Sequence, residues 1–279
     1  MNPPQRLAAI LLIAVTPCLH AQFPHPPGPP SPPGCGKDLK KAQDDLSKCQ
    51  ADLAKSPDDL AKAQAKLDDW PQLKRYADDD ASISAPGNSS DPNTARVVFY
   101  GDSITDGWGR QPATGDFFPG KPYINRGISG QTTPQMLVRF QQDVVHLHPA
   151  AVLILAGTND LAGNTGPSTP QMTEDNFTSM AEIARASGIK VILASITPAF
   201  SYPWKPGVDP VPAIREINAW LKDYCAKQGF TYLDYYSAMS DDKGAMKPGL
   251  AKDGVHPTAA GYAIMGPLAD AAIAKALQK

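Results

Sequence analysis

From Arg96 onward, the chain alternates short apolar runs with longer amphipathic segments. The short runs are rich in β-branched residues and predict five strands, at residues 96–100, 122–125, 151–155, 190–195 and 231–233. The longer segments have helical periodicity and predict helices at residues 133–147, 171–187, 211–228 and 258–277. This alternation is typical of a mostly parallel sheet with helices on both faces. We therefore expect one α/β body over residues 96–279.

The first residues have the pattern of an export signal. An apolar run at residues 7–15 follows a basic residue, and a small residue, Ala21, ends a segment suited to signal peptidase. We expect residues 1–21 to be a cleaved signal peptide and the mature protein to be secreted or periplasmic. A lipoprotein signal ending at Cys18 is the alternative, but Pro17 stands where a small residue is needed.

Three segments separate this signal from the α/β body. Residues 22–36 are rich in proline, which lacks an N–H donor and fixes φ, so they predict a semi-extended linker. Residues 37–76 predict a helical region, and the polar residues 77–95 predict a second linker. Because the candidate chemistry lies after Arg96, the sequence predicts that a chain beginning near Pro92 retains the site.

The helical region carries a repeat of leucines every seven residues. The leucines are Leu39, Leu46, Leu53, Leu60 and Leu67. The segment Ser56-Pro57-Asp58-Asp59 has the features of a helix start, so we expect two helices rather than one. We expect them to pack on each other or on the α/β body. An oligomerising coiled coil is the alternative, which leaves the oligomeric state open.

The composition of the chain limits the kinds of partner that we expect it to bind. The chain has 26 Lys and Arg against 28 Asp and Glu, a net charge of −2, so it has no basic excess for binding nucleic acid. No segment is apolar enough to predict a membrane-spanning helix. The spacing of Cys35, Cys49 and Cys225 matches no zinc pattern, so we expect no cysteine-bound metal.

Candidate chemistry follows the predicted strands. Ser103 follows the first strand, Asn159 follows the third, and Asp253 and His256 share a late loop. Ligands of open α/β sheets bind beyond the carboxyl ends of the strands. A nucleophilic serine needs a base, and an imidazole base needs a carboxylate to fix its tautomer. His256 is the candidate base, because the other histidines lie in the signal, the linker or at the end of a predicted helix.

These segments resemble the four blocks of the GDSL, or SGNH, hydrolase family, over about residues 96–277. The blocks are Gly101-Asp102-Ser103-Ile104-Thr105, Asn125-Arg126-Gly127-Ile128-Ser129-Gly130, Gly157-Thr158-Asn159-Asp160 and Asp253-Gly254-Val255-His256. The resemblance implies a flavodoxin-like doubly wound parallel sheet, here with an N-terminal helical extension. It also implies ester hydrolysis through an acyl-enzyme, with no cofactor and no metal. No G-x-S-x-G motif is present, which argues against the α/β-hydrolase fold.

Residue by residue, the resemblance implies that Ser103 is the nucleophile and that Asp253 and His256 complete a catalytic triad. It implies an oxyanion hole formed by the backbone N–H groups of Ser103 and Gly130 and the side-chain amide of Asn159. Asp102 and Asp160, in the same blocks, are expected to be hydrogen-bond acceptors that stabilise loops rather than catalytic groups.

Aromatic residues lie in segments that follow strand ends, and we expect them to bind substrate. They are Trp108, Phe118, Tyr202 and Trp204. The alternative is that they merely cover the edge of the sheet. Polar side chains are mixed with them, which favours a small-molecule or glycan ester with a short acyl group on a polar or carbohydrate alcohol.

Three other functions remain as alternatives. The first is a lipase or lysophospholipase of the same family. The second is a non-enzymatic, tethered glycan-binding module on a dead hydrolase scaffold, which the intact candidate residues disfavour. The third is a metal phosphatase built on Asp102, Asp160, Asp253 and His256, around which no local D-x-D or paired-histidine spacing is present.

Overall fold

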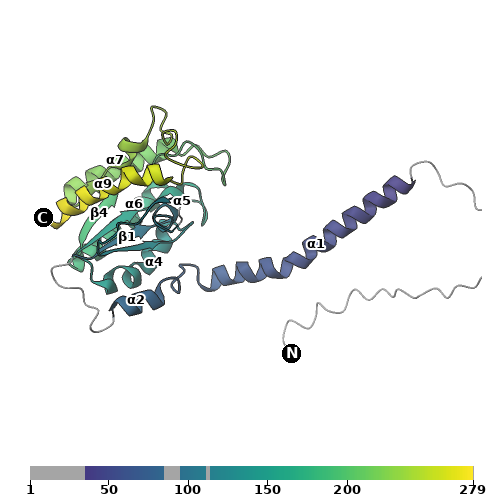
Figure 1. The fold of residues 1–279 in the computed structure, drawn as a ribbon, viewed down its shortest axis with the longest axis horizontal. Coiled ribbons are helices and arrows are strands. Elements are labelled where there is room, and N and C mark those ends of the chain that lie inside the picture. The colour runs from purple at the N-terminus through teal and green to yellow at the C-terminus, as the bar shows by residue number, and fades with distance from the viewer. Residues whose placement is uncertain (1–34, 85–94, 111–113, 279) are drawn as a thin grey trace, which may run out of the picture. The chain divides into compact units, whose positions relative to one another are not determined.

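The computed structural model describes residues 35–84, 95–110 and 114–278 (Figure 1). The predicted signal peptide and residues 22–34 of the predicted proline-rich linker lie outside the described residues. The chain divides into two compact units, residues 1–60 and 61–279, and each is described by itself.

The α/β body is built on a five-stranded sheet. Its strands are β1 (Val97–Gly101), β2 (Tyr123–Gly127), β3 (Ala151–Leu155), β4 (Lys190–Ala194) and β5 (Thr231–Leu233). They lie in the order β2-β1-β3-β4-β5, and all neighbours are parallel. This is the flavodoxin-like doubly wound order, so the predicted fold class is confirmed. Gly101 pairs with both Gly127 and Leu155, so β1, β2 and β3 end at one edge of the sheet.

Helices cover both faces of this sheet. They are α3 (Ser103–Asp106), α4 (Thr133–Asp143), α5 (Thr158–Leu161), α6 (Pro170–Ala186), α7 (Val211–Gln228), α8 (Tyr235–Met239) and α9 (Ala259–Leu277), with a short 3-10 helix, η3 (Val145–Leu147). Residues Val98 and Tyr100 of β1 pack in one core with α4, α6 and α7. Their neighbours Val97 and Phe99 pack in a second core with α8 and α9. The alternation of side chains along a strand thus builds two cores, one on each face (Figure 1).

A single helix, α1 (Cys35–Asp68), occupies most of the predicted helical region. It continues through Pro57, so the prediction of two helices is wrong. Proline removes one intrahelical hydrogen bond, but strong helix formers such as Ala, Leu, Lys and Gln flank it on both sides.

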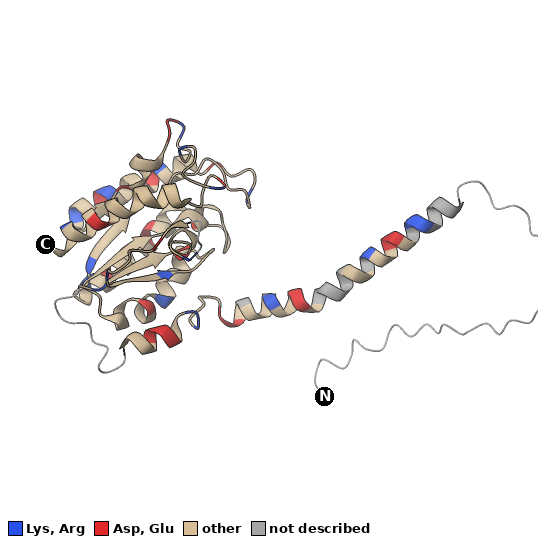
Figure 2. Cartoon of the chain, in the orientation of Figure 1, with Lys and Arg blue, Asp and Glu red and all other residues tan. Residues whose placement is uncertain are grey.

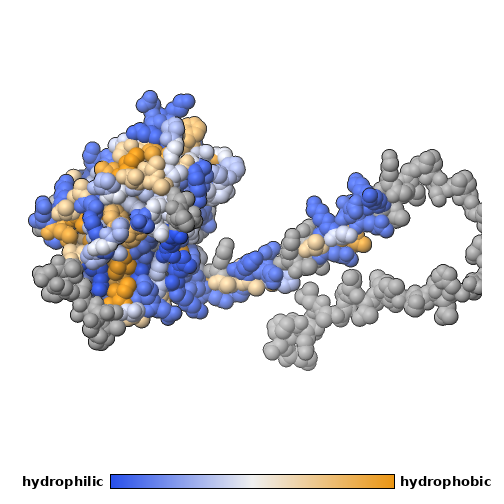
Figure 3. All heavy atoms as spheres, in the orientation of Figure 1, coloured by the Kyte–Doolittle hydropathy of each residue, from blue (hydrophilic) through white to orange (hydrophobic). Residues whose placement is uncertain are grey.

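Three of the heptad leucines of α1 have exposed side chains along the helix. Leu46, Leu60 and Leu67 are 59%, 74% and 73% exposed. Figure 3 shows the mostly hydrophilic surface of α1 with isolated apolar residues along it. Whether these leucines pack within one chain or between chains stays a prediction, and the oligomeric state stays open.

The segment after α1, residues 69–84, is no linker, and we call it the N-terminal strap. It includes helix α2 (Ala77–Ser84), which falls inside the predicted linker 77–95. Three glutamine side chains on or beside α4 donate hydrogen bonds of 2.6 to 2.7 Å to backbone carbonyls of the strap. The pairs are Gln135 with Trp70, Gln131 with Pro71, and Gln142 with Leu73. Residues 69–84 therefore belong structurally to the α/β body.

Buried groups of the strap strengthen this attachment. Tyr76 is buried and donates a hydrogen bond to the carbonyl of Gly127, at the end of β2. Asp80 is buried in α2, whose acidic residues are marked in Figure 2, and accepts a 2.8 Å hydrogen bond from Arg126. Burial raises the pKa of the Asp80 carboxyl, and the charge of Arg126 opposes this. The polar residues that suggested a linker are thus partners of a buried arginine.

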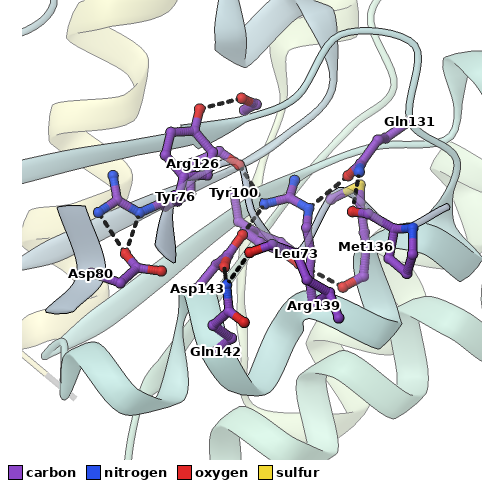
Figure 4. Close-up of polar contacts among 12 residues, drawn as sticks. Leu73, Tyr76, Asp80, Tyr100, Arg126, Gln131, Met136, Arg139, Gln142 and Asp143 are labelled. Atoms are coloured by element: carbon purple, nitrogen blue, oxygen red, sulfur yellow. Dashed lines mark hydrogen bonds and ion pairs between the residues drawn. The ribbon is translucent and has the colours of Figure 1, made fainter. Parts of the chain in front are cut away.

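A second buried arginine connects the strap to the edge of the sheet where the strands end (Figure 4). Arg139 of α4 is fully buried and pairs with Asp143 at 2.8 Å. Its guanidinium also donates to the carbonyls of Gly101 and Arg126, at 3.0 and 2.9 Å, and to the side chain of Gln131 at 2.6 Å. Arg139 therefore fixes the ends of β1 and β2 and the glutamine that holds Pro71.

Candidate active site

The structure brings Ser103, His256 and Asp253 together at the carboxyl edge of the sheet. Ser103 Oγ lies 3.0 Å from His256 Nε2, and His256 Nδ1 lies 2.7 Å from Asp253 Oδ2. Ser103 opens helix α3 directly after β1, and the side chain of Asp102 caps this helix by accepting from the Ile104 N–H at 2.9 Å. The tight strand-to-helix turn therefore presents the hydroxyl to the imidazole.

The loop that carries the other two groups holds its own carboxylate in place. Asp253 Oδ1 accepts from the N–H groups of Val255 and His256, at 3.1 and 2.8 Å. Partial burial acts to raise the pKa of Asp253, but the hydrogen bonds from the backbone and imidazole of His256, with its charge, outweigh burial and lower the pKa. The group beside the imidazole is thus an ionised carboxylate at neutral pH.

Ser103, Gly130, Asn159 and His256 line one cavity of about 320 Å³, which we call the main cavity. Gly130 has a φ of +81°, a conformation that side chains other than glycine rarely adopt. A Cβ there would meet no atom within 4 Å, so the backbone faces open space. The predicted oxyanion-hole residues therefore share the cavity of the serine, and their role in catalysis stays a proposal.

The amide of Asn159 already has partners. Its Nδ2 donates to the carbonyl of Gln131 at 2.9 Å and to Asp102 Oδ2 at a longer 3.3 Å, while its Oδ1 accepts from Asn164 at 2.8 Å. These contacts orient the amide within the site. An oxyanion would compete with Asp102 for the more weakly held N–H.

The two buried aspartates act as acceptors, as predicted. Asp160 accepts from both the N–H and the hydroxyl of Thr133, which joins the α5 segment to the start of α4. Burial raises the pKa of the Asp102 carboxyl to about 7, the hydrogen bond from Ile104 opposes it, and the charge of Asp160 adds to it. Asp102 therefore carries its proton in the folded protein at pH values where an exposed aspartate is ionised.

This raised pKa predicts a pH dependence of stability. Folded Asp102 holds its proton between about pH 4 and its own pKa of about 7, while the unfolded chain has released it. Its contribution to the free energy of unfolding therefore falls as the pH rises through this window. Urea unfolding at about pH 5 and about pH 8 measures the change, which Asp102→Asn should reduce and the exposed control Asp242→Asn should not. An equally steep change in Asp102→Asn would contradict the assignment.

The predicted aromatic substrate contacts separate into two groups. Trp204 lines the main cavity, with its ring 5.6 Å from that of His256, and its Nε1 donates to Asn164 at 3.2 Å. Tyr202 is only 1% exposed and stacks against Trp204 at 5.2 Å. The prediction that Tyr202 contacts substrate is therefore wrong, since burial makes it a support for Trp204.

Trp108 and Phe118 do not line the main cavity. Both rings pack on Phe99 of β1, at 5.9 and 5.0 Å, and Trp108 is buried. They border a separate cavity of about 360 Å³, which we call the apolar cavity. It shares Thr114 and Tyr262 with the main cavity, so these aromatics lie next to the site rather than in it.

Several residues that line the main cavity lie outside the four recognised sequence blocks. Asn164, Lys252 and Tyr262 line the main cavity; Lys252 directly precedes the block that begins at Asp253, and Asn164 follows the block that ends at Asp160, but none of the three belongs to a block. A further cavity of about 650 Å³, the second cavity, adjoins it and is lined partly by the N-terminal strap. Its residues Ala65, Asp69, Trp70 and Gln72 come from the predicted helical region 37–76, so the sequence pattern gave no reason to place these four near the serine.

Two features are absent from the part of the chain that the structure describes. Among the described residues, no group of three or more His, Cys, Asp or Glu side chains is arranged to hold a metal ion. Within those same stretches of chain, no helix has the length and apolar character needed to cross a membrane.

The doubly wound sheet and the hydrogen-bonded serine, histidine and aspartate define an α/β fold with a serine-hydrolase type of site. The model of the GDSL-like lipase/acylhydrolase family matches residues 99–264, and the chain belongs to this family. A GDSL-like lipase from Bacteroides thetaiotaomicron is 44% identical, with a TM-score of 0.69 over 74% of this chain and 98% of that one.

Two further relatives extend the comparison. A proposed acylhydrolase from Bacteroides fragilis is 46% identical, with a TM-score of 0.70 over 75% of this chain and 98% of that one. The esterase TesA of Pseudomonas aeruginosa is 31% identical over 137 residues, which are 49% of this chain and 62% of TesA. The chain thus covers less than two thirds of the curated relatives that it matches.

Proposed function

We propose that the chain is an exported serine esterase that hydrolyses carboxylic esters through an acyl-enzyme. Its preferred substrates carry short acyl groups on a polar or carbohydrate alcohol. The observation that carries the proposal is the continuous hydrogen-bonded line from Ser103 through His256 to Asp253, which opens on the main cavity. Membership of a family of lipases and acylhydrolases supports the reaction type. Export rests on the sequence of residues 1–21 alone.

The reaction begins at the serine hydroxyl. His256 Nε2 accepts the proton of Ser103 Oγ as the oxygen attacks the ester carbonyl carbon, and the Asp253 carboxylate stabilises the imidazolium that forms. The imidazolium then donates this proton to the leaving alcohol as the carbon–oxygen bond breaks. Water, deprotonated by the same imidazole, attacks the acyl-enzyme, releases the acid and restores the serine.

The negative charge of the tetrahedral intermediate needs donors that are fixed before the reaction. The N–H of Ser103 lies in the first turn of α3, where helix geometry supplies no partner for it. Gly130 is held on its carbonyl side by Asn164, whose amide donates to the Gly130 carbonyl at 3.3 Å, while the Gly130 N–H belongs to the preceding peptide. With the amide of Asn159, these groups form the proposed oxyanion hole.

Asn159→Ala should lower kcat by about 10² to 10³, because it removes a donor that acts mainly in the transition state. Steady-state kinetics with p-nitrophenyl acetate measures kcat and KM separately, and circular dichroism checks that the variant is folded. An effect on KM alone would contradict the assignment of Asn159 to the oxyanion hole.

The lining of the main cavity supports a polar substrate. Thr114, Ser129, Asn164 and Lys252 surround the reacting groups, and the aromatic residues Trp204 and Tyr262 complete the lining. A long acyl chain would leave such polar groups without hydrogen-bond partners, which is costly. A short acyl group on a polar alcohol leaves them hydrated or paired.

The apolar cavity favours a second candidate function, hydrolysis of long-chain esters as in lipases and lysophospholipases. Trp108, Phe118 and Pro119 line it, and it meets the main cavity at Thr114 and Tyr262. An acyl chain that crossed this boundary would find an apolar surface. The two functions differ in the chain length that they predict.

A chain-length series decides between them. We expect p-nitrophenyl acetate and butyrate to be hydrolysed with higher kcat/KM than esters of eight or more carbons, because polar side chains of Thr114, Ser129, Asn164 and Lys252 lie around the reacting groups. Acetylated oligosaccharides should release acetate. An optimum at eight carbons or beyond, with turnover of lysophospholipids, would replace the proposed function by the second one.

A further inference from the structure

We propose that the second cavity binds the sugar part of the substrate and that the N-terminal strap supplies its recognition surface, with Trp70 as a stacking platform and Gln72 as a polar contact. The inference rests on the proposed esterase function and deepens it. The second cavity adjoins the main cavity, because Ser129, Gly130 and Asn164 line both. A group attached to an ester bound at Ser103 therefore reaches the second cavity past Gly130.

The chemistry of the lining fits a carbohydrate better than a lipid. Asp69, Gln72, Gln135 and Thr165 surround the space with carboxylate, amide and hydroxyl groups. The large aromatic side chain among the lining residues is Trp70, which is 40% exposed. A flat indole in a ring of polar groups suits the mixed faces of a sugar, whereas an acyl chain would exclude water from those polar groups without offering them hydrogen bonds.

The platform is fixed by its neighbours. Gln135 Nε2 donates to the Trp70 carbonyl at 2.7 Å, and Gln131 Nε2 donates to the next carbonyl, that of Pro71, at 2.7 Å. The Asp69 carboxylate accepts from the N–H groups of Leu73 and Lys74, at 2.8 and 3.1 Å, which closes the turn. A turn anchored at both ends holds its side chains in place before a ligand binds.

Gln72 has an unusual backbone conformation next to the second cavity. Its φ is +58°, a left-handed conformation that glutamine adopts rarely and glycine adopts freely. Its side chain lines the second cavity. Glycine would adopt this backbone conformation without strain, yet the chain has glutamine here, beside a cavity. We infer that the glutamine side chain has a role in binding.

The test compares two substrates in the full-length enzyme: p-nitrophenyl acetate, which lacks a sugar, and chemically acetylated xylotetraose. Trp70→Ala should lower kcat/KM for the oligosaccharide about tenfold more than for p-nitrophenyl acetate, because the loss of an aromatic stacking contact corresponds to about tenfold in affinity. The difference between the two substrates should appear in KM. Trp70→Phe should restore most of it. Gln72→Gly should shift the same ratio in the same direction, and its backbone conformation keeps the fold intact.

Two control variants remove exposed apolar side chains outside the second cavity. Leu73→Ala lies on the same strap, and Phe200→Ala lies on the body. Both should keep the wild-type ratio for the two substrates. If Trp70→Ala and Gln72→Gly lower both substrates equally, or Leu73→Ala matches them, the second cavity is no sugar site. If the wild type releases no acetate from the oligosaccharide, the proposed substrate class fails as well as this site.

Discussion

Ser103→Ala is expected to remove nearly all ester hydrolysis, by a factor on the order of 10⁴ or more. The hydroxyl lies 3.0 Å from the imidazole, and the substitution deletes the atom that would form the acyl-enzyme. Because Ser103 is partly exposed in the main cavity, alanine leaves no buried group unpaired, so the fold should be retained. Hydrolysis of p-nitrophenyl acetate and a thermal melt measure the two effects.

Covalent labelling tests the same residue without a choice of substrate. A fluorophosphonate should label the wild type stoichiometrically and Ser103→Ala not at all, since the reagent traps an activated serine. Ser187→Ala, at an exposed serine after α6, should be labelled like the wild type. An unlabelled wild type that binds glycans would favour the dead-scaffold alternative over the proposed esterase.

The sheet and the triad could be predicted because their signals are local. The strands β3 and β5 begin and end where the sequence predicts, since buried parallel strands appear as short, nearly continuous apolar runs. Ser103 and Asn159 directly follow strands, and parallel strands bring their carboxyl ends to one edge. Asp253 and His256 are three residues apart, so their pairing depends on one tight loop.

The attachment of the N-terminal strap could not be predicted, because its contacts are long-range and polar. Tyr76 and Gly127 are 51 residues apart, and their hydrogen bond leaves no periodicity in the sequence. Arginine is usually a surface residue, yet Arg126 and Arg139 are both buried against groups from distant segments. The burial of Tyr202 against Trp204 was missed for another reason: the sequence of a loop does not show which of two neighbouring aromatic rings is covered.

A chain that begins at Pro92 is therefore expected to lose its fold, contrary to the prediction from sequence, whereas a chain that begins at Ala61 should stay folded and active. Removing residues 61–91 breaks the buried pair of Asp80 with Arg126, at a cost of about 3–5 kcal/mol. It also removes the burial of Tyr76, worth about 1.5–3 kcal/mol.

These losses approach the whole stability of a domain, which is about 5–15 kcal/mol, and three glutamine side chains lose their carbonyl partners as well. Gln131 connects this damage to the site, because it bonds Arg139 through its side chain and Asn159 through its carbonyl. Thermal melts and p-nitrophenyl acetate hydrolysis of the two chains measure the difference. If the chain from Pro92 melts and turns over like the chain from Ala61, the strap contributes neither to stability nor to the position of Asn159.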